Sequence, residues 1–452
     1  MLRLREVHIR QYRAVAPDTK LRFGDEQVFL LGRNGSGKST LLELLARLIA
    51  CDMSAVRAED DPVDVEWVLE WSTALMDGTA THRLRFRFVV APEVVEPLTV
   101  ADSDYDARST PAPGTPTWTL EGTFARASEP AEVVLQAFRY GSDMLPVFEP
   151  ASYSADAISR RPPPDPFGTT FLSSLARYLR PRGEPEVRAA QLALFLPIGL
   201  FQAPIISRFD EALGAYTNLV APEPSGDGGA TIESGHRHLV RRFVPNELFV
   251  ALMESGGTND EANPLTLHST LTLANEAPAT LLHTMARLLG AEDVSLHPRL
   301  QQRDAKGRSL WRGFDLYITW PGGLMHRHDQ LSFGQKRLIA FLWYADVFAQ
   351  VPLLTDELTN GLHSTWVSEL VDLLAGRQAF HAVQNPLLLD MSGPGAEDQV
   401  ATRFVLCEAI TTDDGRAWRW RNPSPTEARR LYSAWDAGFQ HLSEVLVSEG
   451  LW

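Results

Sequence analysis

The sequence contains very little lysine. Only four of its 42 basic residues are lysines, and the others are arginines. One of the four, Lys38, lies in the segment Gly32-Arg33-Asn34-Gly35-Ser36-Gly37-Lys38-Ser39-Thr40. A lysine kept where arginine is used almost everywhere else indicates a position that needs a compact ammonium group on a flexible stem, which a planar guanidinium cannot replace.

Cysteine and long apolar runs are also scarce. The two cysteines, Cys51 and Cys407, exclude a disulfide framework, so we expect thiols in or near the core and a reducing compartment. No run of about 18 apolar residues occurs, which excludes a membrane-spanning helix. The charged first residues lead directly into an extended pattern, unlike a secretory leader. The sequence therefore predicts a cytoplasmic protein that does not bind a membrane.

The charge balance is acidic, with a formal net charge of −15. Because nucleic acids are bound by neutralising phosphates, this charge argues against a surface devoted to nucleic acid. Nucleic-acid binding by local basic patches stays open, and the densest are residues 236–242 and 177–188. For both segments we favour solvated helix faces.

The segment around Lys38 matches the phosphate-binding pattern G-x-x-x-x-G-K-[ST]. Its glycines allow backbone N–H groups to converge on a phosphate, and a following helix adds its positive N-terminal end. The apolar residues Val28–Leu31 predict a buried strand before it, and Thr40–Ala50 predict the helix after it. Strand, glycine loop and helix together predict a nucleotide-binding loop.

A second group of chemically informative residues lies far along the chain. Leu331–Gln335 precedes an apolar helix; Ser332 can cap this helix, and Gly334 allows close approach of a ligand. A simple helix cap explains such a segment when it stands alone. The buried strand Val351–Glu357, which follows the helix and ends in two carboxylates, favours an anion-binding site instead.

The two carboxylates suit different tasks. Asp356 suits a group that supports the direct ligands of Mg²⁺, and these ligands would include the Ser39 hydroxyl and phosphate oxygens. Glu357 suits a base that orients and deprotonates an attacking water. A solvated turn is the alternative for this pair, and the phosphate loop in the same chain argues against it.

The remaining pattern predicts strands first and helices later. Strands are expected over 3–12, 20–31, 64–72 and 81–91, then to about 139, with the arginines of 81–91 pointing outward. Residues 169–300 are expected to be mostly helical. The tail predicts a hairpin, Arg403–Glu408 with Arg416–Arg421, and a helix that runs from a capping box at Ser424 to Gly450.

These motifs resemble those of ABC-type ATPases in the SMC/RecF/OLD-like branch. The matching segments are Val7–Val15 (opening strand), Gly32–Thr40 (Walker A), Leu331–Gln335 (signature), Leu353–Glu357 (Walker B) and Asn360–His363 (D-loop). The resemblance implies an α/β P-loop NTPase head with an antiparallel β subdomain and a helical insert between Walker A and the signature. We expect five segments: 1–55 (core with Walker A), 56–145 (β subdomain), 146–305 (helical insert), 306–395 (signature, Walker B and D-loop) and 396–452 (C-terminal hairpin and helix).

The resemblance also implies a mechanism. Two copies would enclose two ATP molecules with Mg²⁺, held by Gly32–Thr40 of one copy and by Ser332, Gly334 and Gln335 of the other. Glu357 would be the catalytic base, and Ser39 and Asp356 would serve the metal. ATP binding would close the homodimer, or a larger oligomer, and hydrolysis would open it.

Three features depart from the family pattern: the residue at the switch position, Leu358 after the Asp-Glu pair, and the glutamine of the magnesium shell. Gln384 aligns with the switch histidine, and since glutamine cannot carry a proton charge, hydrolysis is expected to be slow or dependent on a partner. His381 is the alternative candidate for this role. The sequence does not place the glutamine that normally completes the magnesium shell; Gln136 and Gln202 are the candidates, and neither lies in a matching motif.

The insert distinguishes between branches. Lys38 and Ser332 are separated by 294 positions, more than transporter-type heads need, and the insert has no sustained heptads for a coiled coil. These features favour a compact head, and the resemblance to compact ATPases encoded beside separate effectors implies a switch for a nuclease or toxin in bacterial anti-phage defence. A RecF-like DNA-repair ATPase is the alternative. A third reading, a scaffold that scarcely hydrolyses ATP, is disfavoured by Glu357.

Overall fold

The computed structural model describes residues 1–50, 62–75, 78–90, 118–126, 129–140, 143–147, 267–268, 281–303, 309–393, 395–412, 415–438, 441–448 and 450. The chain divides into two units. The first comprises Met1–Ile205, Gln350–Asp356 and Leu374–Trp452, and the second comprises Ile206–Ala349 and Glu357–Leu373.

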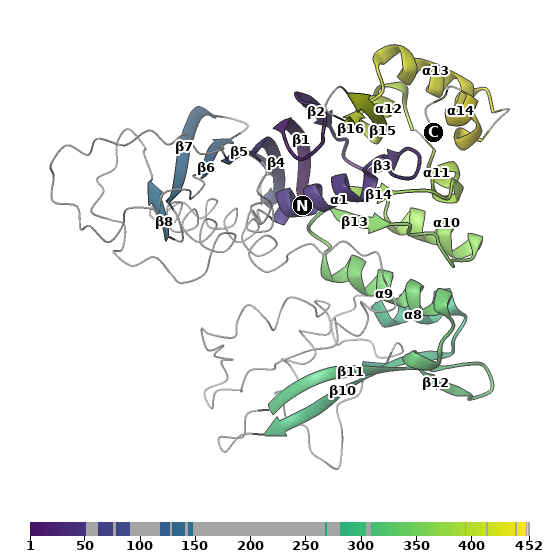
Figure 1. Cartoon of the computed structure of the whole chain (residues 1–452). Coiled ribbons are helices and arrows are strands. Elements are labelled where there is room, and N and C mark those ends of the chain that lie inside the picture. The colour runs from purple at the N-terminus through teal and green to yellow at the C-terminus, as the bar shows by residue number, and fades with distance from the viewer. Residues whose placement is uncertain are drawn as a thin grey trace, which may run out of the picture. The chain divides into compact units, whose positions relative to one another are not determined.

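A five-stranded sheet in the first unit carries the phosphate loop. Its order is β13-β14-β3-β15-β16, and the first four strands are parallel to one another, whereas β16 pairs antiparallel with β15 (Figure 1). The bounds are β3 Gln27–Leu31, β13 Leu353–Asp356, β14 Ala379–Ala382, β15 Phe404–Thr412 and β16 Gly415–Arg421. Every residue of β3 and β14 is buried, as expected for strands covered on both faces.

Helix α1, Lys38–Ala50, follows β3 through the glycine loop. Its apolar side chains are almost completely buried: Leu41, Leu42, Leu44, Leu45, Leu48 and Ile49. The predicted succession of strand, glycine loop and helix is therefore confirmed.

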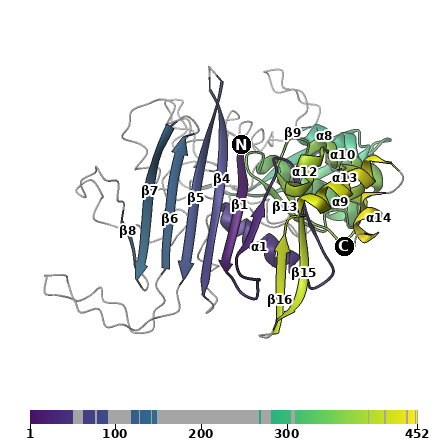
Figure 2. The ribbon, with the colours of Figure 1, turned by 90° about the horizontal axis from the view of Figure 1, so that it is seen from above.

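The same unit contains an antiparallel sheet of seven strands in the order β2-β1-β4-β5-β6-β7-β8, which Figure 2 shows side by side. The bounds are β1 Leu2–Gln11, β2 Thr19–Arg22, β4 Val63–Leu75, β5 Gly78–Val90, β6 Trp118–Arg126, β7 Glu129–Tyr140 and β8 Asp143–Val147. In β5, Phe86 and Phe88 are buried and Arg85 is exposed, which confirms the predicted alternation.

The second unit has a four-stranded sheet, β12-β11-β10-β9, and three α-helices among its described residues. The bounds are β9 Leu267–His268, β10 Asp293–Arg303, β11 Ser309–Thr319, β12 Met325–Arg327, α8 Leu281–Leu289, α9 Phe333–Val347 and α10 Ser364–Leu373. A short 3₁₀ helix, His328–Gln330, leads into α9.

The prediction of a mostly helical stretch over 169–300 is wrong where β9 and β10 lie. In β10, Val294 and Leu296 are buried on one face and pair with β11, a period-two pattern that belongs to a strand. Helix α8 agrees with the prediction, and the rest of this stretch lies outside the described residues. The five-segment division of the chain stays a prediction.

The tail contains more helices than expected. Helices α11, Leu387–Ser392, and α12, Glu397–Arg403, precede the predicted hairpin, which is confirmed as β15 and β16. The single helix expected up to Gly450 is wrong, because α13 spans Pro425–Asp436 and α14 spans Leu442–Ser448. Gly438, at φ +69°, adopts a left-handed conformation that ends a helix. The capping box of Ser424 and Glu427 is confirmed.

Candidate nucleotide-binding site

The phosphate loop lies between β3 and α1. Gly35 and Gly37 have φ of +79° and +84°, a conformation that side chains with a Cβ rarely adopt. The N–H of Ser36 donates to the Arg33 carbonyl across the loop at 3.2 Å. The loop is therefore tightly curved at the N-terminus of α1, where backbone N–H groups and the helix dipole favour an anion.

Two side chains of this loop fit a phosphate ligand. Lys38 is 7% exposed, and its ammonium donates to the Gly32 carbonyl at 2.6 Å and to the Arg33 carbonyl at 3.3 Å. The Ser36 hydroxyl is buried, and it has no hydrogen-bond partner among the described residues. A buried cation and an unsatisfied buried hydroxyl are both suited to phosphate oxygens.

The predicted metal residues come together although they are far apart in the chain. The Ser39 hydroxyl donates to the Asp356 carboxylate at 3.0 Å, and both groups belong to the first unit. A hydroxyl, a carboxylate and phosphate oxygens are the ligands that Mg²⁺ prefers. Among the described residues no group of three or more His, Cys, Asp or Glu could hold a metal ion by itself.

Strand β16 covers the outside of the phosphate loop, which the sequence did not predict. The Gly35 carbonyl accepts hydrogen bonds from the Trp418 indole at 3.1 Å and from Arg416 at 3.2 Å. The Ser36 carbonyl accepts from the Trp420 indole at 3.2 Å. The only signal in the sequence was two tryptophans two residues apart, which places both on one face of the strand.

Gln384 lies beside the loop, as its alignment with the switch histidine requires. It is exposed, and it lines a pocket of about 730 Å³ with Gly32, Arg33 and Asn34. The opposite wall comes from α14 and includes Ser443, Glu444, Val447 and Ser448. No feature of the sequence indicated that α14 would reach this pocket.

His381, the alternative to Gln384, is a core residue. Its side chain is completely buried, and Nδ1 shares a hydrogen bond with the Thr355 hydroxyl at 2.7 Å. Burial, and to a lesser degree the charge of Arg403, lowers the pKa of His381 to about 3. A ring that is buried and neutral supports the choice of Gln384 for the switch position.

The signature segment belongs to the second unit. Ser332 caps α9, and it exchanges hydrogen bonds with Gln335 in a capping box. Gly334 packs directly against Gly361 of the D-loop, because a Cβ at Gly334 would overlap with the Gly361 carbonyl. The glycine is thus required by packing, and its predicted approach to a ligand stays a prediction.

Glu357 is held by the signature helix. The buried Arg337 of α9 donates to the carbonyls of Glu357 and Leu358, the latter at 3.1 Å. The Asn360 amide donates to the Glu357 carboxylate, and Glu357 itself has φ +53°. This left-handed backbone is uncommon for a residue with a Cβ and occurs often at functional sites.

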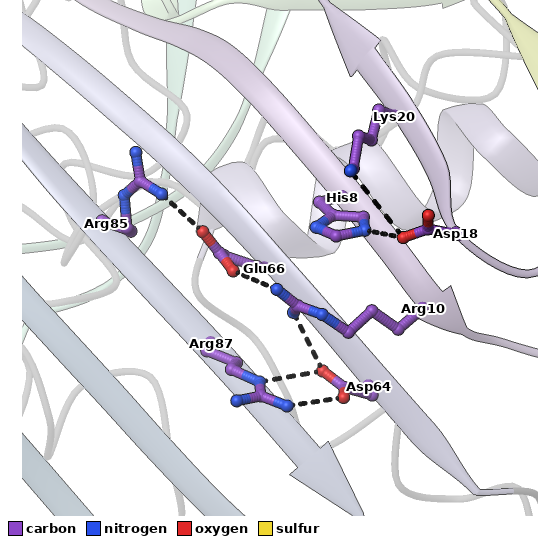
Figure 3. Close-up of polar contacts among 8 residues, drawn as sticks. All are labelled: His8, Arg10, Asp18, Lys20, Asp64, Glu66, Arg85 and Arg87. Atoms are coloured by element: carbon purple, nitrogen blue, oxygen red, sulfur yellow. Dashed lines mark hydrogen bonds and ion pairs between the residues drawn. The ribbon is translucent and has the colours of Figure 1, made fainter.

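The outer face of the seven-stranded sheet carries a network of ion pairs (Figure 3). Arg10 bonds to Glu66 at 2.8 Å and to Asp64 at 3.4 Å, Arg87 bonds to Asp64 at 2.7 Å, and Arg85 bonds to Glu66 at 2.7 Å. Burial by itself would raise the pKa values of Asp64 and Glu66, but the arginine hydrogen bonds and charges lower them below their usual range. The arginines that the sequence placed outward are therefore paired with carboxylates.

The remaining predicted residues are less defined. Thr40 lies in the first turn of α1, half-buried. Gln136 lies in β7, and Gln202 and Cys51 lie outside the described residues. Cys407 is buried, and burial raises the pKa of its thiol to about 12. No helix among the described residues is long and apolar enough to cross a membrane.

The parallel sheet, the glycine loop at the start of α1 and the Ser39–Asp356 contact define a P-loop nucleotide-binding fold. A family profile described as ABC transporter matches residues 21–108, which include the whole phosphate loop. No curated protein matches the sequence. Residues 21–108 thus resemble an ABC-type ATPase.

Among solved structures, the chain is similar to heads of SMC proteins. An SMC head bound to the C-terminal winged-helix domain of ScpA is 11% identical, with a TM-score of 0.37 and coverage of 94% of this chain and 98% of that chain. The SMC head domain from Thermotoga maritima is 11% identical, with a TM-score of 0.30 and coverage of 92% and 98%. An SMC head from Pyrococcus furiosus is 11% identical, with a TM-score of 0.36 and coverage of 96% and 100%.

Proposed function

We propose that this protein binds and hydrolyses ATP with Mg²⁺ and that two copies close around the nucleotide. The observation that carries the proposal is the contact between Ser39, at the start of α1, and Asp356, at the end of β13. It joins the two motifs that a P-loop ATPase needs for phosphate and metal, although 317 positions separate them in the chain.

Each residue has a proposed task. Lys38 and the N–H groups of its loop would hold the phosphates, and Ser39 and Asp356 would hold Mg²⁺, which neutralises phosphate charge when bound. Glu357 would orient and deprotonate the attacking water. Gln384 would hydrogen-bond this water or the terminal phosphate, without the charge of a histidine.

The proposed dimer rests on the signature segment. Ser332 is exposed at the N-terminus of α9, where its backbone and hydroxyl can meet an anion. Such a site recognises a terminal phosphate only when another copy presents it. ATP would thus hold two copies together, and hydrolysis would weaken the pair.

We further propose that this cycle controls a separate effector, a nuclease or a toxin, in bacterial anti-phage defence. The absence of sustained heptads in the insert and the acidic net charge of −15 support a switch rather than a DNA clamp. The alternative, a RecF-like DNA-repair ATPase, requires affinity for DNA.

Two variants test the ATPase proposal. Lys38→Ala removes the buried ammonium, and we expect it to abolish ATP binding in calorimetry. Glu357→Gln keeps the shape of the base but removes its charge, so it should bind ATP and accumulate as a dimer or larger assembly in light scattering. ATP affinity unchanged in Lys38→Ala would refute the loop assignment. Glu357→Gln that stays monomeric with saturating ATP and Mg²⁺ would refute the dimer.

A further inference from the structure

We propose that Arg416, Trp418 and Trp420, here called the β16 clamp, position the phosphate loop for its ligand. These residues would not touch the nucleotide. They would act by holding the outer side of the loop, so that its inner N–H groups keep the arrangement that a phosphate requires. The expected effect on ATP rests on the proposed function, whereas the effect on the loop itself does not.

The clamp holds two consecutive carbonyls. Trp418 and Arg416 both donate to the Gly35 carbonyl, and Trp420 donates to the Ser36 carbonyl. The two indole rings are stacked, with centroids 6.2 Å apart and an angle of 8° between their planes. The indole N–H groups of Trp418 and Trp420 therefore approach the loop from the same face of β16.

Because the peptide bond is planar, fixing a carbonyl of the loop also fixes the direction of the next residue's N–H. In a trans peptide the C=O of one residue and the N–H of the next point in opposite directions. Fixing the Gly35 carbonyl outward directs the Ser36 N–H inward, where it meets the Arg33 carbonyl at 3.2 Å. Fixing the Ser36 carbonyl directs the Gly37 N–H away from β16 in the same way. The clamp thus fixes the orientation of two consecutive peptide groups of the phosphate loop.

The loop glycines are matched to the clamp. A Cβ at Gly35 would lie 2.7 Å from the Arg416 guanidinium, and a Cβ at Gly37 would lie 2.9 Å from the Trp418 ring. At Gly37 the Trp418 ring leaves no room for a side chain, whereas at Gly35 the exposed Arg416 side chain could move, and it is the left-handed backbone, at φ +79°, that favours glycine.

Strand β16 is itself fixed at this point. The backbone N–H of Trp418 donates to the Ala14 carbonyl, and the backbone N–H of Ala16 donates to the Trp418 carbonyl, both at 2.7 Å. At the end of the strand, the Asn422 amide donates to the carbonyls of Arg22 and Phe404, each at 3.0 Å. A donor on such an anchored strand keeps its direction, which is what a positioning residue needs.

Two clamp variants and one matched control test this proposal. Trp418→Phe keeps an aromatic ring beside Gly37 but removes the indole N–H, and Arg416→Ala removes an exposed donor. Arg419→Ala is the control, because Arg419 is an exposed arginine of the same strand whose ion pair is with Glu408, at 3.8 Å. Amide hydrogen exchange of residues 33–38 without nucleotide, the thermal midpoint, and the Kd for ATP are measured for each.

We expect faster exchange in residues 33–38 for both clamp variants, with the thermal midpoint close to that of the wild type. The loss of one hydrogen bond corresponds to a Kd for ATP raised by about fivefold. Arg419→Ala should resemble the wild type in all three measurements. Wild-type loop exchange in both clamp variants would overturn the proposal. A wild-type protein that binds no ATP would refute the proposed function, while the exchange measurement would still decide whether the clamp holds the loop.

Discussion

Gln384 is exposed beside the phosphate loop, and in the proposed switch role its amide would be the group presented to a nucleotide. A glutamine can donate and accept hydrogen bonds, but it cannot take up a proton near neutral pH, as a histidine can. We expect Gln384→His to raise the rate of ATP hydrolysis with little change in the Kd for ATP. Steady-state kinetics measure the first and calorimetry the second. If the rate does not rise, the glutamine is not what limits hydrolysis.

His381 gives the folded protein a pH dependence. Its pKa is about 3 when folded, below the usual value of about 6.5, so the unfolded chain binds more protons as the pH falls below 6.5. Stability supplied by the neutral ring is therefore fully present above pH 6.5 and decreases toward pH 3. Between pH 7 and pH 5 the wild type should lose about 2 kcal/mol more unfolding free energy than His381→Gln.

Denaturant unfolding at pH 7, 6 and 5 measures this difference. The window lies above the titration of the carboxylates, and His328, whose pKa burial also lowers, contributes equally to both proteins. The quantity to compare is therefore the change in unfolding free energy between pH 7 and pH 5 in each protein. The absolute stabilities of the two proteins need not be equal. Equal slopes for the wild type and His381→Gln would mean that His381 is protonated in the folded state.

At the residue scale, the sequence predicted the groups that carry chemistry and missed the groups that support them. Ser39 and Asp356 were placed together because their motifs have known roles, and the structure gives their contact at 3.0 Å. The bond from Trp418 to Gly35 joins residues 383 positions apart, and no local pattern links them. This bond forms because the tertiary fold brings β16, through its pairing with β15, beside the phosphate loop.

At the element scale, α14 forms part of the wall of the pocket beside the phosphate loop. It is fastened to α11 through Ser443, whose N–H and hydroxyl both donate to the Asp390 carboxylate at 2.9 Å. Helix α11 begins directly after Pro386, close to Gln384 in the chain. One carboxylate thus connects the last described helix to the segment that carries the switch position.

We expect Asp390→Ala to loosen α14. Hydrogen bonds to a charged group contribute about 2 kcal/mol, so the amides of residues 442–448 should exchange about thirtyfold faster. Mass spectrometry of deuterium uptake measures this. Asp436→Ala, at the exposed end of α13, is the matched control and should leave the exchange of α14 unchanged. Exchange in α14 that is equally slow in Asp390→Ala would show that its apolar contacts suffice.

Helices and strands were predictable where the spacing of apolar residues followed a single clear period. The alternation in β5 and the apolar strand β3 gave the right structures. The tail was harder, since an apolar stripe continued across Gly438 at helical spacing, while the backbone there is left-handed and separates α13 from α14. In β10, the short alternation of Val294 and Leu296 was hidden within a longer pattern that resembled helices.

At the scale of the whole molecule, charge separates the proposed switch from a DNA clamp. The net charge is −15, and the arginines on the outer face of the seven-stranded sheet, Arg10, Arg85 and Arg87, are paired with Asp64 and Glu66 (Figure 3). Arginines that already neutralise carboxylates gain less from a phosphate than unpaired ones, because the existing ion pairs must be replaced.

We therefore expect no saturable binding of duplex DNA by the wild type at micromolar concentration and 50 mM salt, measured by fluorescence anisotropy. The double variant Asp64→Asn with Glu66→Gln removes two negative charges from beneath the arginines, and it should gain weak binding that disappears at 200 mM salt. The RecF-like alternative predicts the opposite for the wild type: clear binding at 50 mM salt that weakens by about a thousandfold at 200 mM salt. Such a result would place DNA among the ligands of this ATPase, because an acidic chain binds DNA only when a specific surface overcomes its net charge.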